Sequence, residues 1–181
     1  MKHPFFDYPT FKYKVSDWDF KKKGLLKRIK DDRLVRDSRD FYNTDRPTNE
    51  NSYVNFLSDL LHPELEEFYN ESKCRCSMTD AWAVRYDKGD HQTAHCHRAW
   101  GFSGVLYVNF DAEVHTSTYF IRPWLDRCGQ TYIATPPAEE GVMYIFPSSL
   151  LHFVIPNKSN KKRMIVSFDL LPKLPDHQAV D

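Results

Sequence analysis

Short strand-like segments separated by turn residues fill the sequence from Cys74 onward, and this pattern limits the fold more than any other feature. The segments are rich in β-branched and aromatic residues and lie near 75–87, 92–97, 102–110, 117–122, 142–146, 151–155 and 163–170. Turn residues separate several of them, at 87–89, 136–137 and 156–160. Segments of this number and length predict a mostly β protein, either a sandwich or a barrel.

Before Cys74, the sequence predicts a helical region that supports these strands. Its elements are a strand at 11–15, helices at 17–30, 51–61 and from Pro63 to near Asn70, and a polar loop at 31–50 that contains Pro47. We expect His62 to be the cap of the last helix. The whole chain, 1–181, then reads as a single domain with helical support at 1–73, a β core at 74–172 and a tail at 173–181.

Composition limits the partners and the environment of the chain. Its 181 residues include 25 basic and 25 acidic residues, so no net field would steer it onto nucleic acid or a membrane surface. The four cysteines have no disulfide-framework spacing, and neither a signal core nor a run of ~18 apolar residues is present. We therefore expect a soluble cytoplasmic protein with reduced thiols, while its oligomeric state stays unknown.

Three histidines carry the strongest chemical pattern. His95 and His97 are two residues apart, a spacing that puts both imidazoles on one face of a β-strand. His152 lies in a second strand-like segment and can reach the same place from a neighbouring strand. Three neutral nitrogens that converge on one side of a sheet would hold a divalent transition metal and leave coordination positions open.

The last predicted strand begins with an arginine. Arg163, Ile165, Ser167 and Asp169 alternate with the apolar residues Met164, Val166, Phe168 and Leu170. An arginine on a strand face that also presents a serine is a good fork for a carboxylate.

Over roughly residues 80–170, these elements resemble the 2-oxoglutarate- and Fe(II)-dependent dioxygenases, on the prolyl-hydroxylase side of that superfamily. Tyr86, Gly89 and His95 match a Tyr-x-x-Gly-x5-His motif, 106–109 resembles its Tyr-Leu-Asn strand, and 141–152 resembles the segment that ends in the distal histidine. Arg163 follows His152 by eleven residues, close to the spacing of the family. Within the superfamily, the chain is most similar to a subfamily found in phages and marine bacteria.

The resemblance implies a double-stranded β-helix, or jelly roll, with the helices on one outer face. It implies that His95, His97 and His152 hold Fe(II) and that 2-oxoglutarate and O2 are co-substrates. Arg163 would pair with the distal carboxylate of 2-oxoglutarate, with Ser167 and Tyr86 as hydrogen-bond donors. The implied reaction hydroxylates an unactivated C–H of a peptide or protein side chain or a small metabolite, with release of succinate and CO2. A phage product would act in the host cytoplasm.

One position departs from the motif, because His97 stands where the family has a carboxylate ligand. Either His97 binds the metal in an all-histidine site, or water or a carboxylate from elsewhere takes that position. Asp169 and Asp111 are the candidate carboxylates.

Other functions stay open. A jelly-roll dioxygenase can use a three-histidine iron centre without 2-oxoglutarate, and such an enzyme has no need of a carboxylate fork at Arg163. A non-catalytic jelly-roll binding protein would keep the histidines without turnover. A structural zinc protein would need its metal to fold, and Cys74 and Cys76 could join His95 and His97 in such a site.

The remaining histidines and Cys96 are predicted to lie outside the site. His91 would share the face of His95 but lie ~13 Å away along a strand, and His3, His115 and His177 are expected at the surface. Cys96 should point away from its two neighbours and pack. The long segment 124–140 is either a covering loop or part of the substrate entrance.

Overall fold

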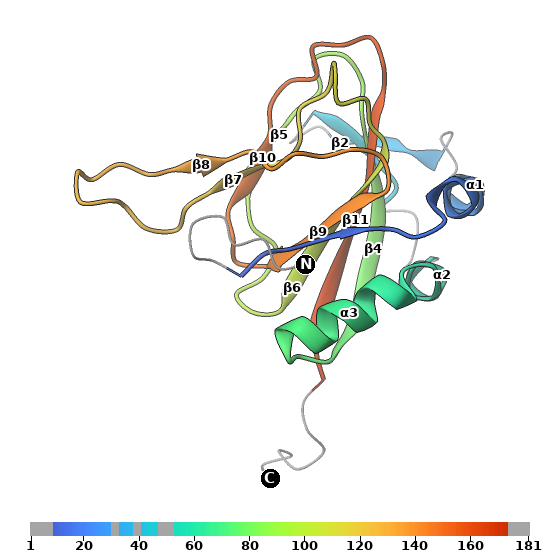
Figure 1. The fold of residues 1–181 in the computed structure, drawn as a ribbon. Helices are drawn as coiled ribbons and strands as arrows, with labels where there is room; N and C mark the ends of the chain where they lie inside the picture. Colours follow the sequence, from blue (N-terminus) through green and yellow to red (C-terminus); the bar gives the residue numbers. More distant parts are fainter. Residues whose placement is uncertain (1–8, 30–32, 38–40, 47–52, 174–181) are drawn as a thin grey trace.

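The computed structural model describes residues 9–29, 33–37, 41–46 and 53–173 (Figure 1). Its helices are α1 (Trp18–Arg28), α2 (Val54–Leu60) and α3 (His62–Ser72). Its strands are β1 (Phe11–Lys14), β2 (Val35–Asp37), β3 (Tyr42–Thr44), β4 (Cys76–Tyr86), β5 (Gln92–His95), β6 (Phe102–Asn109), β7 (Tyr119–Ile121), β8 (Ile133–Ala134), β9 (Val142–Pro147), β10 (His152–Val154) and β11 (Arg163–Pro172).

The strands form two antiparallel sheets. The large sheet has the strand order β1-β9-β6-β11-β4-β3-β2, and the small sheet has the order β5-β10-β7-β8. Apolar residues from both sheets, such as Tyr107 and Phe146 from the large sheet and Phe120 and Val154 from the small one, form one buried cluster. The predicted mostly β class with two facing sheets is therefore confirmed.

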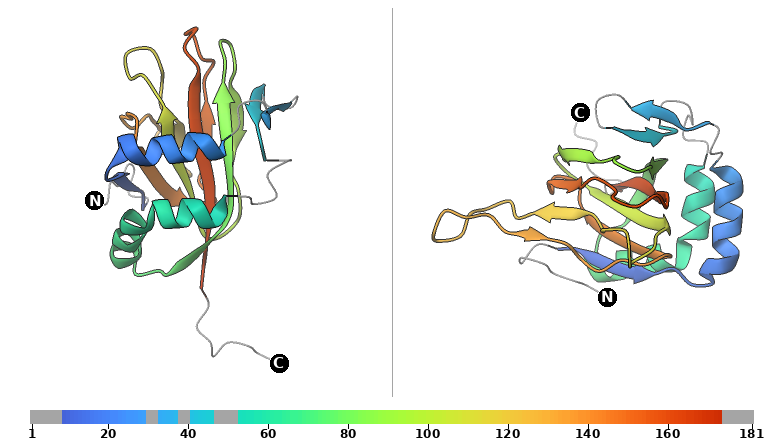
Figure 2. Two further views of the ribbon diagram at one scale, coloured as in Figure 1. Left: turned by 90° about the vertical axis from the view of Figure 1, so that its right-hand side faces the viewer. Right: turned by 90° about the horizontal axis from the view of Figure 1, so that it is seen from above.

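A second core lies on the other face of the large sheet, where the helices cover it (Figure 2). Leu25, Leu57 and Phe68 come from the helices, and Val166 and Phe168 come from β11. The helices therefore lie outside the two sheets, as predicted. The long central strand β11 separates the two cores, because successive side chains of a strand point to opposite faces.

Phe168 requires a glycine on the neighbouring strand. Phe168 and Gly104 are paired across β11 and β6. A Cβ atom at Gly104 would lie 2.0 Å from Cζ of the Phe168 ring, which is closer than any real contact. The ring therefore occupies the space above the glycine and fills the helix-side core.

The prediction of a loop at 31–50 is wrong in part, because β2 and β3 form a hairpin there and extend the large sheet. Thr44 pairs with Val84, and its Oγ1 donates to the Ala83 carbonyl at 2.8 Å. The Asp45 carboxylate accepts the Ala83 N–H at 2.8 Å. Polar residues are common on edge strands, which explains why composition alone suggested a loop. Pro47 lies outside the described residues.

The helix limits also differ from the prediction. α1 spans Trp18–Arg28, where the sequence predicted a helix at 17–30, and residues 51–52 at the expected start of the next helix lie outside the described part. Leu61, not His62, is the N-cap of α3, and His62 is already helical. Pro63 follows in the first turn, where its missing N–H costs nothing.

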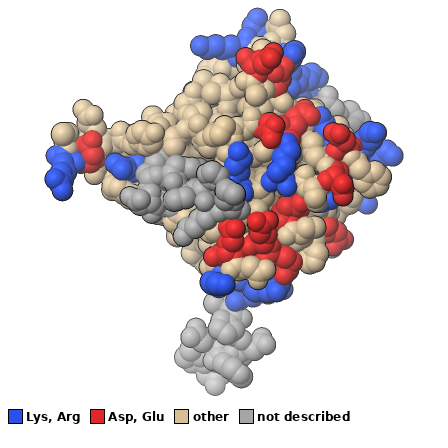
Figure 3. Space-filling model, in the orientation of Figure 1, with Lys and Arg blue, Asp and Glu red and all other residues tan. Residues whose placement is uncertain are grey.

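The surface does not carry a single sign of charge. On the face shown in Figure 3, acidic and basic side chains are interspersed over the body of the molecule. Each helix in the described ranges is too short or too polar to reach across a lipid bilayer.

Candidate metal centre

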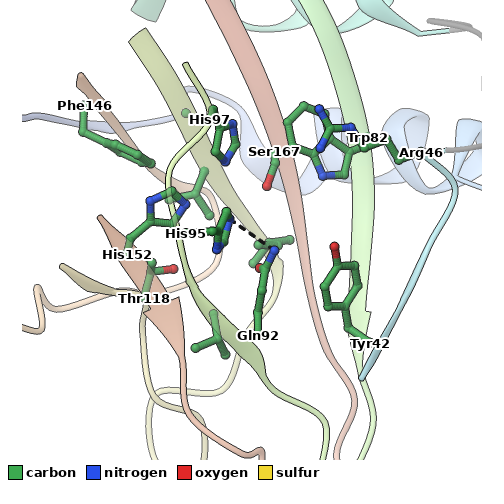
Figure 4. A pocket seen from close by; sticks show the side chains of 14 residues that line it. Tyr42, Arg46, Trp82, Gln92, His95, His97, Thr118, Phe146, His152 and Ser167 are labelled. Atoms are coloured by element: carbon green, nitrogen blue, oxygen red, sulfur yellow. Dashed lines mark hydrogen bonds between the residues drawn. The ribbon is translucent and has the colours of Figure 1, made fainter. Parts of the chain in front are cut away.

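His95, His97 and His152 come together between the two sheets (Figure 4). His95 ends β5, His152 begins β10, and the two residues are direct partners across these strands. The strand ends before His97, yet all three ligand atoms lie within 4.8 Å of one another. Spacing on a regular strand therefore suggested the correct pair, although His97 itself lies in the irregular segment that follows β5.

Hydrogen bonds fix the tautomers of His95 and His152. Nδ1 of His95 lies 2.9 Å from the Thr93 carbonyl oxygen, and Nδ1 of His152 lies 2.9 Å from that of Leu150. A carbonyl oxygen only accepts, so both Nδ1 atoms carry the proton. The lone pair of each neutral ring is then on Nε2, which is the atom that a metal binds. Consistently, the amide nitrogen of Gln92 lies 3.2 Å from Nε2 of His95 and donates to it.

A carboxylate fixes the third ring. His97 Nδ1 donates to Oδ1 of the buried Asp169 at 2.8 Å, and the His97 N–H donates to the Ser148 carbonyl at 2.9 Å. Burial alone raises the pKa of Asp169, but hydrogen bonds and charge from His97, a hydrogen bond from Ser103 and the charge of Arg98 outweigh it. The pKa of the Asp169 carboxyl is therefore below its ordinary value, and the residue is an anion.

The most deeply buried ring of the triad is neutral. Burial, followed by the positive charges that His95 and His97 could carry, holds the pKa of His152 well below its ordinary value. A neutral imidazole is the form that binds a metal.

A cavity of about 220 Å³ opens beside the triad. It is lined by Tyr42, Arg46, Trp82, Gln92, His95, His97, Gly104, Val105, Thr118, Phe146, His152, Val154, Ile165 and Ser167. In Figure 4, Ser167 and Trp82 lie on the large-sheet side of the triad, and Thr118 and Phe146 lie near His152. The volume is below the roughly 300–1,000 Å³ of drug-sized ligand sites, so the cavity suits a small molecule.

Arg163 lies behind one wall of this cavity. The residue is 3% exposed, and its guanidinium packs 5.0 Å from the ring centroid of Tyr86, 5.7 Å from that of Tyr107 and 5.8 Å from that of Phe110. One nitrogen, Nη2, donates to Thr118 Oγ1 at 3.3 Å, while Nε has no hydrogen-bond partner. Within the described ranges, no carboxylate pairs with this buried cation.

Thr118 is a site residue that the sequence reasoning missed. Its Oγ1 accepts from Arg163 and also from the Tyr107 hydroxyl, which lies 3.2 Å away and in turn accepts the Thr118 N–H at 3.0 Å. The hydroxyl proton of Thr118 is then left to donate toward the cavity. The signal was present in the sequence, since Thr118 shares a strand face with the buried Phe120.

Tyr86 lies beside the triad but contacts it indirectly. Its hydroxyl donates to Oε1 of Gln92 at 2.8 Å, and the amide nitrogen of the same Gln92 reaches His95. The sequence reasoning had missed Gln92 as well. The contribution of Tyr86 to 2-oxoglutarate binding stays a prediction.

Comparison with known proteins identifies the family. Residues 80–169 match a family model described as "Putative 2OG-Fe(II) oxygenase", where 2OG is 2-oxoglutarate. The chain belongs to this oxygenase family. The matched segment runs from β4 to the end of β11 and contains all three histidines of the triad. No curated protein has a significant match to the sequence.

Solved structures share the fold of this oxygenase. A prolyl-4-hydroxylase from Pseudomonas putida has 14% identity and a TM-score of 0.56 over 92% of this chain and 94% of that one. The epimerase SnoN from nogalamycin biosynthesis has 12% identity and a TM-score of 0.70, with coverages of 94% and 82%. HygX from Streptomyces hygroscopicus has 10% identity and a TM-score of 0.64, with coverages of 91% and 83%. The double-stranded β-helix implied by the resemblance is confirmed.

The family implies Fe(II) and 2-oxoglutarate as cofactor and co-substrate of the oxygenase. The triad fits an iron ion, because each Nδ1 is already bonded to an oxygen and each ring, when neutral, presents an Nε2 lone pair. Neither proposed carboxylate belongs to the group of ligand atoms. Asp169 lies behind His97, and Asp111 pairs with Lys161 at the surface. Both were wrong as candidate ligands.

Other sequence predictions for the oxygenase need correction. Cys96, which follows the last residue of β5, is exposed rather than packed. His115 is buried rather than at the surface. Its Nε2 donates to the Lys161 carbonyl at 3.0 Å, and its Nδ1 accepts the Asp111 N–H at 3.0 Å. His3 and His177 lie outside the described residues.

The cysteines of the Cys74-x-Cys76 pair stay away from the triad. Their sulfur atoms lie 3.8 Å from each other, and no cysteine belongs to the metal-binding group found among the described residues. His91 also stays outside that group, as predicted, and stacks on Phe41 with ring centroids 5.0 Å apart.

The segment 124–140 neither covers the site nor borders it. Strands β7 and β8 carry the tip of this segment away from the body of the oxygenase as a projecting arm (Figure 1). Trp124, Leu125 and Tyr132 are exposed on the arm, and no residue of 124–140 lines the cavity.

Proposed function

We propose that the chain is a 2-oxoglutarate-dependent hydroxylase in which His95, His97 and His152 hold Fe(II). The observation that carries this proposal is the convergence of three Nε2 lone pairs, each fixed by a hydrogen bond at Nδ1, beside a small cavity. Membership of the oxygenase family supports iron as the metal.

Bound iron supplies the oxidation chemistry: one O2 and one 2-oxoglutarate are consumed, a substrate C–H becomes C–OH, and succinate and CO2 leave. The chain contributes the geometry of the ligands and a sheltered cavity. Burial of His152 and of the aromatic walls around it limits the access of water to the reacting centre.

The distal carboxylate of 2-oxoglutarate would bind at Thr118, with Arg163 behind it. A buried guanidinium without a carboxylate partner is costly, and an anion in the adjacent cavity would offset that cost. The Thr118 hydroxyl can donate to such an anion while it accepts from Arg163. Ser167 lines the same cavity and adds a second hydroxyl donor. Tyr86 would act on this site through Gln92, because its hydroxyl donates to the Gln92 side chain.

The substrate would enter past Tyr42, Trp82 and Arg46, which line the side of the cavity away from His152 in Figure 4. The Arg46 side chain is 50% exposed and its guanidinium lies 4.1 Å from the centroid of the Trp82 ring. Because the cavity is small, only the reacting group of a larger substrate fits beside 2-oxoglutarate. A side chain of a peptide or protein, or a small metabolite, meets this requirement.

Several structural neighbours support this substrate range. One is a prolyl-4-hydroxylase, and HygX was solved with nickel, 2-oxoglutarate and hygromycin B bound. The place of the chain in a phage and marine-bacterial subfamily, its single-domain organisation and its cytoplasmic location are parts of the same proposal.

Succinate production tests the function. Anaerobically loaded Fe(II) protein, mixed with 2-oxoglutarate and then exposed to O2, should form succinate even without a prime substrate. The His152→Ala variant serves as the matched control and should form none above background. Equal rates for the two proteins would refute the assignment of the triad as the iron site.

A second candidate is a dioxygenase that uses the three-histidine centre without 2-oxoglutarate. The all-histidine triad favours it, as does the position of Arg163, whose guanidinium does not itself line the cavity. Calorimetric titration separates the two. Binding of 2-oxoglutarate to the metal-loaded, oxygen-free protein supports the hydroxylase, and its absence supports the second candidate.

A further inference from the structure

An anion lies directly behind the one ligand that departs from the family motif. His97 stands where the motif has a carboxylate, and its ring hydrogen bonds to the carboxylate of Asp169 at 2.8 Å. On the basis of the iron site proposed above, we propose that Asp169 is a positioning residue. It orients His97 and supplies, through the imidazole, the negative charge that an all-histidine triad lacks.

The two oxygens of the Asp169 carboxylate have different surroundings, because His97 and Ser103 both donate to Oδ1. The carboxylate is 1% exposed, and its Oδ2 has no hydrogen-bond partner. The nearest fixed cation is Arg98, whose Nε lies 3.7 Å from Oδ2 on a side chain that is 40% exposed. A buried carboxylate needs a compensating charge. A divalent cation on the far side of the His97 ring would add to the compensation that Arg98 supplies.

The sheet holds this carboxylate in place before any metal binds. Asp169 and Ser103 are direct partners across β11 and β6, and Ser103 Oγ donates to Oδ1 at 2.7 Å. Ser103 also hydrogen bonds to Ser148 Oγ at 2.9 Å. The register between β11 and β4 shifts directly after Asp169, an irregularity of the kind that re-aims a side chain.

His95 and His152 provide an internal comparison. Their Nδ1 atoms donate to backbone carbonyls, which orient a ring but carry no net charge. His97 instead donates to an anion, and a charged acceptor makes the stronger hydrogen bond. The three rings therefore differ in the electron density that they can offer a metal, with His97 the strongest donor.

Asp169→Asn separates charge from geometry, because the amide oxygen can still accept from His97 while the negative charge is gone. Cobalt(II) titration of the oxygen-free protein, followed by visible absorption, measures the effect. Loss of an outer-shell partner costs about 10–100-fold in metal affinity, and we expect about tenfold here because the acceptor remains. Ser103→Ala is the matched control, since it removes a bond to the same oxygen without changing the charge, and it should have a smaller effect.

A His97→Asp background makes the test specific for charge. The new carboxylate restores the anionic ligand of the motif, but it cannot donate to Asp169, so two buried carboxylates then face each other. In this background Asp169→Asn should leave the cobalt affinity unchanged or raise it. A merely structural role for Asp169 predicts a loss of affinity in both backgrounds, and that result would overturn the proposal.

A measurement on the unaltered protein covers the case in which Asp169→Asn does not fold. In the zinc-loaded wild type, the Nδ1–H proton of His97 should resonate further downfield in NMR spectra than those of His95 and His152. Equivalent shifts for the three rings would overturn the proposal. Wild-type protein that binds neither cobalt nor zinc would refute the proposed iron site itself. If Asp169→Asn leaves the cobalt affinity unchanged in the protein that retains His97, only the proposed role of Asp169 is refuted.

Discussion

The two faces of the large sheet use the same strand for different purposes. On the helix side, Met164, Val166, Phe168 and Leu170 of β11 pack into a core of apolar side chains. The side facing the small sheet carries the polar residues of the same strand. Arg163 donates to Thr118 in the cavity wall, Ser167 lines the cavity, and Asp169 accepts a hydrogen bond from His97 of the triad. Stability and chemistry are thus divided between alternate residues of one strand. A substitution on one face should therefore leave the property of the other face largely intact.

The largest effect is expected at the triad. His152→Ala removes one of three nitrogen ligands, so cobalt(II) affinity should fall by more than the roughly 100-fold that loss of an outer-shell partner costs. Calorimetric titration measures this, with His91→Ala as the histidine control that should bind cobalt like wild type. Near wild-type affinity of the His152→Ala protein would remove this residue from the metal site.

The next largest effect is expected on the stability of the fold, from a residue on the helix-facing side of β11. Phe168 is fully buried against Gly104, so Phe168→Ala should lower the free energy of unfolding by about 3–5 kcal/mol. The neighbouring Ser167→Ala faces the cavity and should change it by no more than about 0.5 kcal/mol. Urea denaturation of both variants checks the contrast. Similar losses for the two substitutions would show that the faces are not divided as described.

A third prediction concerns the anion site. Arg163→Ala should raise the dissociation constant for 2-oxoglutarate about ten- to hundredfold, because it removes the cation behind Thr118 that supports the charge-assisted hydrogen bond of the Thr118 hydroxyl, a bond that contributes about 1.5–3 kcal/mol. Arg163→Lys keeps the charge but loses the fork, and should recover part of the affinity. Thr118→Val should also weaken binding, because it removes the hydroxyl between Arg163 and the cavity.

Calorimetry on metal-loaded, oxygen-free protein measures these dissociation constants, with metal content determined for each variant. Unchanged affinity in all three variants would exclude Arg163 and Thr118 from the co-substrate site. A loss of metal together with the loss of affinity would point instead to a disturbed core, because the Arg163 side chain is buried among aromatic rings.

The smallest effect on metal affinity and stability is expected at Cys96, which lies between His95 and His97 in the sequence. Cys96 is exposed, so Cys96→Ser should change neither the melting temperature nor the cobalt affinity beyond experimental error. Thermal denaturation followed by circular dichroism, together with the cobalt titration, provides the check. A clear loss of metal from this variant would mean that Cys96 is packed in the protein rather than exposed.

Local patterns predicted much of the fold. The alternation along β11 identified the residues of each face correctly, because the period of two belongs to the strand itself. Helical spacing of apolar residues likewise found the helices, although their ends shifted. The hairpin of β2 and β3 escaped notice, since its polar residues form bonds to β4 that composition does not reveal.

The functional site was likewise predicted only in part. Spacing and order in the sequence selected His95, His97, His152 and Arg163 as candidates. The partners of these residues could not be predicted, because Asp169 and Thr118 reach them only through strand pairing and sheet packing. For the same reason, Asp169 was expected as a ligand candidate and instead lies one hydrogen bond behind one.

The sequence by itself therefore determined which residues can do chemistry and which face of a strand each one occupies. Both follow from residue type and from a repeat of two, which need no distant contacts. Tertiary structure decided where His97 lies after β5 and which charge lies behind its ring. Those properties depend on atoms brought within about 3 Å by the pairing of strands far apart in the chain.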